Sequence, residues 1–177
     1  MQNSTPVQLV FGAVRFTYQK LRDQVAYCGE DGPPFPKEKE LVKAQLVVEL
    51  MDRYRYGPHD IRVDALVALK GPDLHYMEAD VLVEKAQKPF LAFLVEAPVL
   101  YKKNKDENLL KLFAIGASFP RKLFPSYLIY YTRWYKGENL HRKFVCIDIK
   151  KYPTVFAWQK AGFPNTGYIP SSGSLKG

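Results

Sequence analysis

The sequence has 177 residues, of which 47% are apolar and 25% are charged. These values are ordinary for a globular chain with one core, so they exclude an intrinsically disordered or fibrous protein. No apolar run approaches the roughly 18 residues of a membrane span, and Met1 to Pro6 lacks the features of a signal peptide, so we expect a cytoplasmic protein without membrane contact. Residues 1–170 are predicted to form a single α/β domain, and residues 171–177 a flexible tail.

The charge balance is basic. Lysine and arginine outnumber aspartate and glutamate by 26 to 18, which gives a formal net charge of +8. Such a charge favours encounters with a polyanion such as nucleic acid, although the basic residues come in small scattered groups that a solvated surface explains as well. Cys28 and Cys146 lie far apart without metal-ligand spacing, which predicts two reduced thiols.

The first third of the chain contains one clear helix signal. Val7 to Tyr18 has β-forming residues of mixed periodicity, which favours no single structure, and Gln19 to Tyr27 is compatible with a helix. After a Pro/Gly-rich connection, a helix is expected from about Lys37. From Glu38 to Arg55 the apolar residues fall on one side of a helical wheel and should face a sheet, with the polar residues Gln45, Glu49 and Asp52 on the other side.

The rest of the chain predicts strands around a second helix. Ile61 to Leu69 alternates as a half-buried strand does, and Gly71-Pro72-Asp73 marks a turn. Met77–Glu84 and Phe90–Ala97 read as an antiparallel hairpin with a connection of about five residues, and Phe90 to Val95 is apolar on both faces, as in a central strand. The remaining predicted elements are a helix over Lys105–Gly116, strands over Tyr127–Thr132 and Phe144–Ile149, and a short helix over Tyr152–Ala161.

Two acidic residues of the predicted hairpin are candidates for chemistry. A hairpin loop centred on Gln87 would place Asp80 diagonally from Glu96, at roughly 7–8 Å, and a loop centred on Lys88 would place the two opposite one another, at about 5 Å. Either register puts both carboxylates on one side of the sheet, whereas a shift by one residue would separate them. Paired buried carboxylates repel unless a proton or a divalent cation lies between them, and Mg²⁺ prefers such oxygen ligands.

Glu40 is the third candidate. It lies within the apolar stripe of the first helix, where a carboxylate is unexpected. As a first-turn glutamate it can remain solvated and interact with the positive end of the helix. Alternatively, it supplies a further carboxylate to the site of Asp80 and Glu96, directly or through water.

The order of these elements resembles a known family. Pro36-Lys37-Glu38 through Leu41-Val42, Tyr54-Arg55-Tyr56-Gly57, Ala79-Asp80-Val81 and Leu94-Val95-Glu96 are similar to segments of the nuclease domain at the N-terminus of type I restriction enzyme R subunits, including its stand-alone relatives. The similarity covers about Phe35 to Thr132. It implies a restriction-endonuclease-like (PD-(D/E)XK) α/β fold, in which helices flank a central mixed sheet.

By that resemblance, Asp80 and Glu96 match the metal-binding acids and Glu40 matches the helix glutamate of a DNA endonuclease that uses Mg²⁺, with Mn²⁺ as the alternative. The family pattern departs at one point. The family has a Glu-x-Lys motif, whose lysine is thought to position the attacking water or stabilise negative charge. This chain reads Glu96-Ala97-Pro98, so the lysine is missing. Lys102 or Lys103 would have to reach back as a substitute.

Three classes of function therefore stay open. The first is a magnesium-dependent endonuclease that cleaves DNA through Glu40, Asp80 and Glu96. The second is a non-cleaving descendant of that fold that binds DNA or a subunit of a restriction-modification system. The third is an unrelated basic α/β protein in which Asp80 and Glu96 form ordinary ion pairs.

Overall fold

The computed structural model describes residues 7–11, 14–21, 24–28, 38–69, 75–120 and 123–173, the first three ranges as backbone only. The helices are Glu38–Asp52 (α1), Pro98–Tyr101 (α2), Lys105–Ser118 (α3) and Val155–Lys160 (α4), with a 3₁₀ turn at Pro58–Asp60. The strands are Val7–Phe11 (β1), Val14–Leu21 (β2), Gln24–Cys28 (β3), Ile61–Leu69 (β4), His75–Lys85 (β5), Lys88–Val95 (β6), Tyr127–Lys136 (β7) and Asn139–Asp148 (β8).

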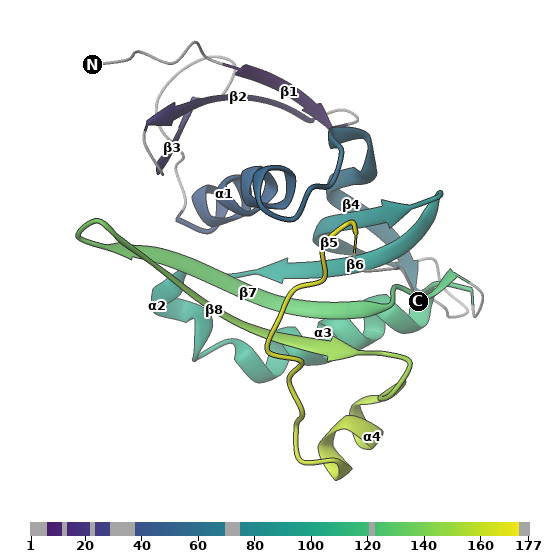
Figure 1. Cartoon of the computed structure of the whole chain (residues 1–177). Helices are drawn as coiled ribbons and strands as arrows, with labels where there is room; N and C mark the ends of the chain where they lie inside the picture. The colour runs from purple at the N-terminus through teal and green to yellow at the C-terminus, as the bar shows by residue number, and fades with distance from the viewer. Residues whose placement is uncertain are drawn as a thin grey trace.

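A five-stranded sheet in the order β4-β5-β6-β7-β8 forms the centre of the molecule (Figure 1). All neighbouring strands are antiparallel except β6 and β7, which are parallel. A parallel pair needs a long crossover, and α2 and α3 supply it. The predicted α/β class with a central mixed sheet flanked by helices is therefore confirmed.

The two faces of the sheet carry separate cores. Helix α1 covers one face and helix α3 covers the other (Figure 1). The core beneath α1, here the α1-side core, includes Leu46, Leu50, Val81, Val83, Leu91, Phe93, Val95, Ile129 and Tyr131. The core beneath α3, here the α3-side core, includes Ala79, Leu82, Ala92, Leu94, Leu112, Ile115, Leu128 and Tyr130. Because β6 and β7 contribute to both cores, they are apolar on both sides, as predicted for the central strand.

The hairpin of β5 and β6 is confirmed, but its connection is shorter than predicted. Only Ala86 and Gln87 lie outside the strands, and both have positive φ, 48° and 61°, as in the two-residue turns that match strand twist. The register Val81↔Phe93 and Leu82↔Ala92, extended by one residue, puts Asp80 opposite Leu94. This is the register of a loop centred on Gln87, although a bulge between Val83 and Glu84 shifts the pairing next to the turn.

Helix α1 is buried on more sides than its pattern predicts. Its apolar side packs on the sheet as expected, but Gln45 and Glu49 of the predicted polar side are also buried, at 7% and 6% exposure. Glu49 accepts hydrogen bonds from the Tyr131 hydroxyl and the Arg133 guanidinium, both at 2.9 Å, and lies 2.6 Å from the Arg142 guanidinium. The carboxylate is therefore buried because β7 and β8 supply its counter-charges.

The segments near the chain ends differ from expectation. The run from Gln19 to Tyr27 is compatible with a helix by sequence, but its described residues, 19–21 and 24–27, belong to β2 and β3, which form a second sheet with β1. At the other end, the Ser172 N–H donates to the Tyr54 carbonyl at 2.9 Å, so this part of the predicted tail is tied to the end of α1. The predicted turn at residues 71–73 and residues 174–177 lie outside the described residues. Within the described chain, no helix has the length and apolar character to cross a membrane.

Candidate functional site

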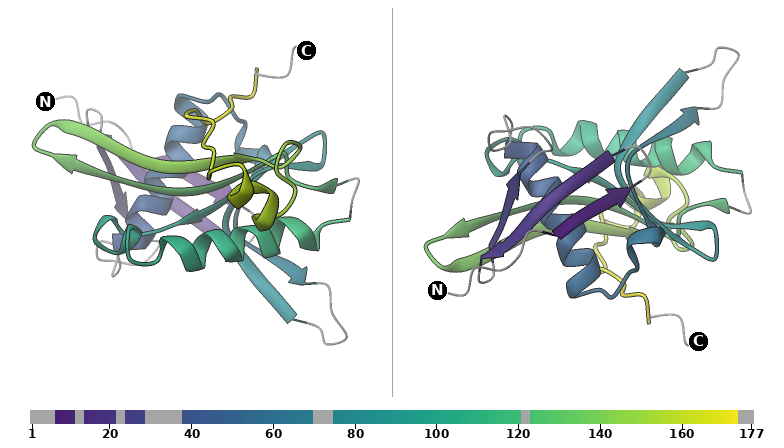
Figure 2. Two further views of the ribbon diagram at one scale, coloured as in Figure 1. Left: turned by 90° about the horizontal axis from the view of Figure 1, so that it is seen from below. Right: turned by 90° about the horizontal axis from the view of Figure 1, so that it is seen from above.

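Strands β4 and β5 change faces at a pair of aspartates. Ile61 and Val63 of β4 belong to the α1-side core, whereas Ala65 and Val67 belong to the α3-side core. The switch occurs at Asp64, whose φ of +52° lies in the left-handed region that non-glycine residues rarely adopt. Beyond it, the outer part of the β4–β5 hairpin projects past the rest of the sheet (Figure 2).

Strand β5 makes the same switch opposite Asp64. Its residues Val81 and Val83 face the α1-side core and Ala79 faces the α3-side core, while the ladder pairs Val63 with Val81 and Ala65 with Ala79. Asp80 lies between these pairs. The kink thus leaves two aspartates side by side where the strands cross from one helical layer to the other.

Asp80 is buried, with 2% of its surface exposed. One carboxylate oxygen accepts the Val95 N–H at 2.7 Å, and the other lies 2.8 Å from the Lys39 ammonium of α1. Burial raises the pKa of Asp80 above its ordinary value, and Lys39 and the Val95 hydrogen bond oppose the shift without cancelling it. The site therefore holds the ionised carboxylate at a cost, as functional sites often do.

Asp80 is one of three carboxylates that converge. Ligand oxygens of Asp64, Glu78 and Asp80 all lie within 4.8 Å of one another. Burial raises the pKa of Glu78, and repulsion from Asp64 and Asp80 raises it further. A cation among these oxygens would relieve that repulsion. An Mg²⁺ ion with bonds of about 2.1 Å spans oxygens up to about 4.2 Å apart and keeps several waters, so these residues fit it after a small closure or through a bridging water.

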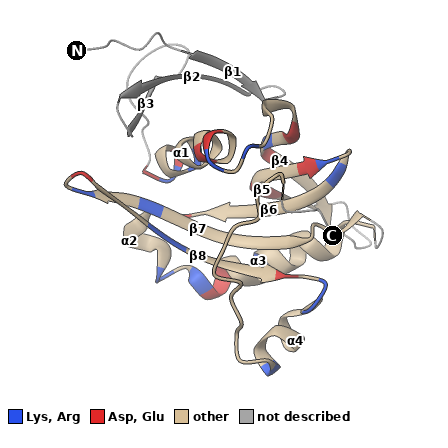
Figure 3. Ribbon diagram, in the orientation of Figure 1, with Lys and Arg blue, Asp and Glu red and all other residues tan. Residues whose placement is uncertain are grey.

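Glu40 is linked to this cluster by an ion pair with Lys43, which also contacts Asp64. The Lys43 ammonium lies 2.7 Å from Glu40 and 2.5 Å from Asp64, and Lys43 is only 4% exposed. Burial alone would lower the pKa of Lys43, but its hydrogen bonds to Asp64 and Glu40 outweigh burial and raise it. Lys43 is therefore a fixed internal counter-ion, and α1 brings both acids and lysines to the cluster. Figure 3 shows these charges together along the helix.

Glu96 lies elsewhere. Its oxygens accept hydrogen bonds from the backbone N–H of Ala97 at 2.9 Å and from the side-chain amides of Asn104 at 2.9 Å and Asn108 at 3.3 Å. Asn104 and Asn108 belong to the start of α3, and Leu94, two residues before Glu96, belongs to the α3-side core. Asp80 is instead held from α1.

The prediction that Asp80 and Glu96 share one side of the sheet is therefore wrong. The observed register is one of the two that were predicted, the one centred on Gln87, but the prediction assumed unbroken alternation along β5. The face switch at Asp64 and Asp80 turns Asp80 toward α1. As a result, the structure groups Asp80 with Asp64 and Glu78, with Glu40 one lysine away, and leaves Glu96 as the residue that fastens β6 to α3.

The lysines suggested as substitutes for the missing Glu-x-Lys lysine also lie elsewhere. Lys102 and Lys103 are exposed after α2, and within the described residues neither forms an ion pair with these acids. The lysines beside the carboxylates are Lys39 and Lys43, which the sequence analysis missed. Their signal was their spacing: Lys39 and Lys43 lie four residues apart, and Lys43 lies three residues after Glu40. Side chains at these spacings are neighbours on a helix surface.

Comparisons with known proteins do not assign the chain to a family. No protein-family model matches the chain. No curated protein matches it at a significant level either. The resemblance to type I restriction nuclease domains therefore stays a prediction based on the residues quoted for it.

Proposed function

We propose that the chain is a metal-dependent DNA endonuclease domain of restriction-endonuclease-like type, related to the R subunits of type I restriction enzymes. Its metal ligands are Asp64, Glu78 and Asp80 in place of the predicted pair Asp80 and Glu96. The observation that carries the proposal is the convergence of these three carboxylates within 4.8 Å, with an Asp-bearing strand and a Glu-bearing helix in the order that the resemblance requires.

The charge of the cluster supports a divalent ion. Glu40, Asp64, Glu78 and Asp80 carry four formal negative charges, and Lys39 and Lys43 neutralise two of them. The two remaining charges match one Mg²⁺ or Mn²⁺. Such an ion, when bound, generates hydroxide from water and neutralises charge that develops on a phosphodiester.

The two lysines have different parts in this proposal. Lys43 is buried between two acids and holds them in place. The Lys39 side chain is 38% exposed, and among the described residues its acidic partner is Asp80. With a cation held by Asp80, the Lys39 ammonium would lose its attraction to that carboxylate and could contact a phosphate of the substrate. Lys39 thereby takes the role that the Glu-x-Lys lysine has in the family.

A second candidate is a non-cleaving descendant of the same fold that binds DNA or a restriction-modification partner. The observation that favours it is the pair of lysines itself, because ammonium groups already stand beside Asp64 and Asp80. In that case the lysines replace the metal permanently. The basic surface then acts alone: Figure 3 shows lysine and arginine on several elements, including β7, β8 and the segment before α4.

Cleavage of supercoiled plasmid in Mg²⁺ or Mn²⁺ tests the first candidate, with the wild type run beside Asp80→Asn and Glu96→Gln. We expect metal-dependent nicking that Asp80→Asn abolishes and Glu96→Gln retains. Nicking that survives Asp80→Asn is contamination or another site, and either result contradicts the proposal. If the wild type does not nick but binds DNA with an affinity that falls steeply with salt, the second candidate holds. If it does neither, both fail.

A further inference from the structure

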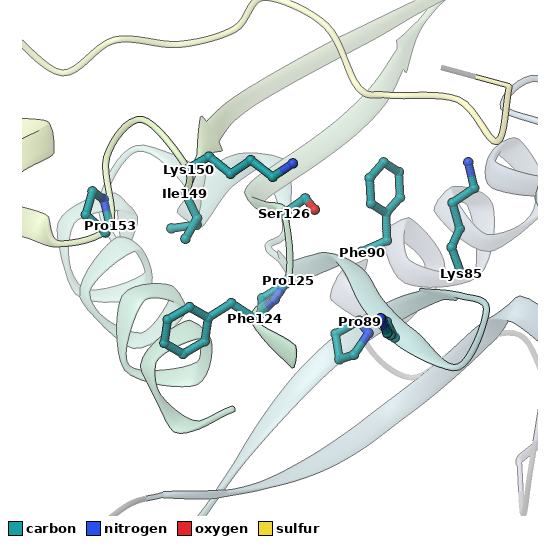
Figure 4. Close-up of a pocket in the computed structure, with 10 residues that line it drawn as sticks. Lys85, Pro89, Phe90, Phe124, Pro125, Ser126, Ile149, Lys150 and Pro153 are labelled. Atoms are coloured by element: carbon teal, nitrogen blue, oxygen red, sulfur yellow. The ribbon is translucent and has the colours of Figure 1, made fainter. Parts of the chain in front are cut away.

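A second concave site lies at the other end of β6 from the acidic cluster. It is a cavity of about 390 Å³, lined by Lys85, Lys88, Pro89, Phe90, Phe124, Pro125, Ser126, Ile149, Lys150 and Pro153 (Figure 4). Its size lies within the range of small-molecule sites. The lining comes from the β5–β6 turn, the segment before β7 and the segment after β8, so three separate parts of the chain meet there.

The charge of this cavity has one sign. Three of the described residues that line it are lysines, and none is acidic. Lys88 and Lys150 are exposed, and within the described residues neither forms an ion pair with a carboxylate. Lys85 donates to the Ser172 carbonyl, which fixes its ammonium 5.2 Å from the centre of the Phe90 ring. The cavity is therefore complementary to an anion.

Apart from Ser126, the remaining lining is apolar, and most of it consists of proline and phenylalanine rings. Pro89, Pro125 and Pro153 present rigid rings, and the Phe124 side chain lies among them (Figure 4). Phe90 forms the floor, because it is 4% exposed and packs edge-on against Tyr127. Flat apolar groups beside lysines suit a ligand that joins a planar ring to a phosphate, since aromatic stacking and phosphate contacts together hold unpaired bases.

We propose that this cavity binds a nucleotide unit of single-stranded DNA. The proposal rests on the proposed function and deepens it, because it names an unpaired strand as the form of DNA that the chain contacts. Phe90 lines the cavity, and Val95, five residues along β6, hydrogen bonds to Asp80. Five residues of strand measure about 17 Å, a length that a few nucleotides of single strand can span. A strand held at the cavity is thus long enough to reach the acidic cluster, which a free nucleotide is not.

The test measures binding without cleavage. Every variant carries Asp80→Asn, metal is removed with a chelator, and the probe is a fluorescein-labelled single strand of about twelve deoxythymidines, within the usual site sizes. Lys88→Gln with Lys150→Gln is expected to weaken binding about tenfold and to reduce the slope of log affinity against log salt by about 1.4, the value for two lost phosphate contacts. Phe124→Leu is expected to weaken binding severalfold at unchanged slope.

The matched control is Lys136→Gln with Lys160→Gln, which removes the same charge from two exposed lysines outside the cavity. It should change the affinity less than twofold. An equal loss in both double variants shows a diffuse basic surface and overturns the proposal. So does a duplex of the same length that binds as tightly as the single strand, or a free thymidine monophosphate that competes as well as the strand. Because no cleavage is measured, intact binding with no nicking by the wild type would contradict the proposed function alone.

Discussion

Replacing Lys39 by methionine should strengthen metal binding and weaken cleavage at the same time. The Lys39 ammonium lies 2.8 Å from the Asp80 carboxylate, and an Mg²⁺ ion on that oxygen would be about 2.1 Å from it, so cation and ammonium would be at most about 5 Å apart. With the dielectric constant of water, which suits a half-exposed side chain, a double and a single charge at about 5 Å repel by about 1.7 kcal/mol. The affinity for Mg²⁺ or Mn²⁺ should therefore rise about 15- to 20-fold in Lys39→Met.

Calorimetric titration of the metal-free protein with Mn²⁺ measures this gain, and plasmid nicking measures the activity. Losing a charge that acts on the phosphate should slow nicking by about 10²–10³ at saturating metal. Lys102→Met is the control, because Lys102 is an exposed lysine without an ion pair to the cluster, and it should change neither quantity more than twofold. An unchanged or weaker metal affinity in Lys39→Met would refute the reasoning, since it would show that no cation competes with Lys39 for Asp80.

Three further predictions concern stability and reactivity. Glu49→Leu leaves the buried Arg133 uncompensated and should lower the free energy of unfolding by about 3–5 kcal/mol, or Tm by at least about 6 °C. The control Glu84→Leu should lower it by less than about 1 kcal/mol, because its partner Arg62 is exposed. Similar losses in the two thermal melts would contradict this prediction. The raised pKa of Asp80 means that the folded protein binds its proton more readily than the unfolded chain. In urea unfolding at pH 7, Asp80→Asn should thus be at least as stable as the wild type. As the pH falls through the pKa of Asp80 in the folded protein, the wild type should gain stability relative to Asp80→Asn. A clear loss of stability in Asp80→Asn at pH 7 would show that the Lys39 ion pair outweighs burial. Burial raises the pKa of the Cys146 thiol to about 12, so iodoacetamide should label this thiol only in denaturant. If mass mapping finds Cys146 labelled equally in the native and the denatured protein, its burial is disproved.

The elements that depend on periodicity were predictable. Strand β4 has the predicted bounds of Ile61–Leu69, and α3 begins at the predicted Lys105, because each presents its apolar residues at the spacing of one face. The hairpin turn was predicted three residues too long. Its flanks Lys85, Lys88 and Pro89 resemble a loop in composition, but Ala86 and Gln87 adopt positive φ and let the strands continue to the turn.

The site was predictable only in part, because one local conformation decides it. Asp80 and Glu40 were identified by residue type and by the resemblance, and both lie in or beside the cluster. The alternation of Ile61 to Leu69 alone would place Asp64 on the solvent side of its strand. Its positive φ has no signature in the sequence, since aspartate is only modestly favoured there, and that single angle moves Asp80 away from Glu96.

The change of face in β4 and β5 also has a consequence for how the protein opens. Each strand inserts side chains into both hydrophobic cores, Val63 into one and Ala65 into the other in the case of β4. Neither helical layer can detach without breaking the ladder that anchors the opposite layer. Amide protons of α1 and of α3 should therefore exchange with solvent at similar free energies of opening, as parts of a single cooperative unit.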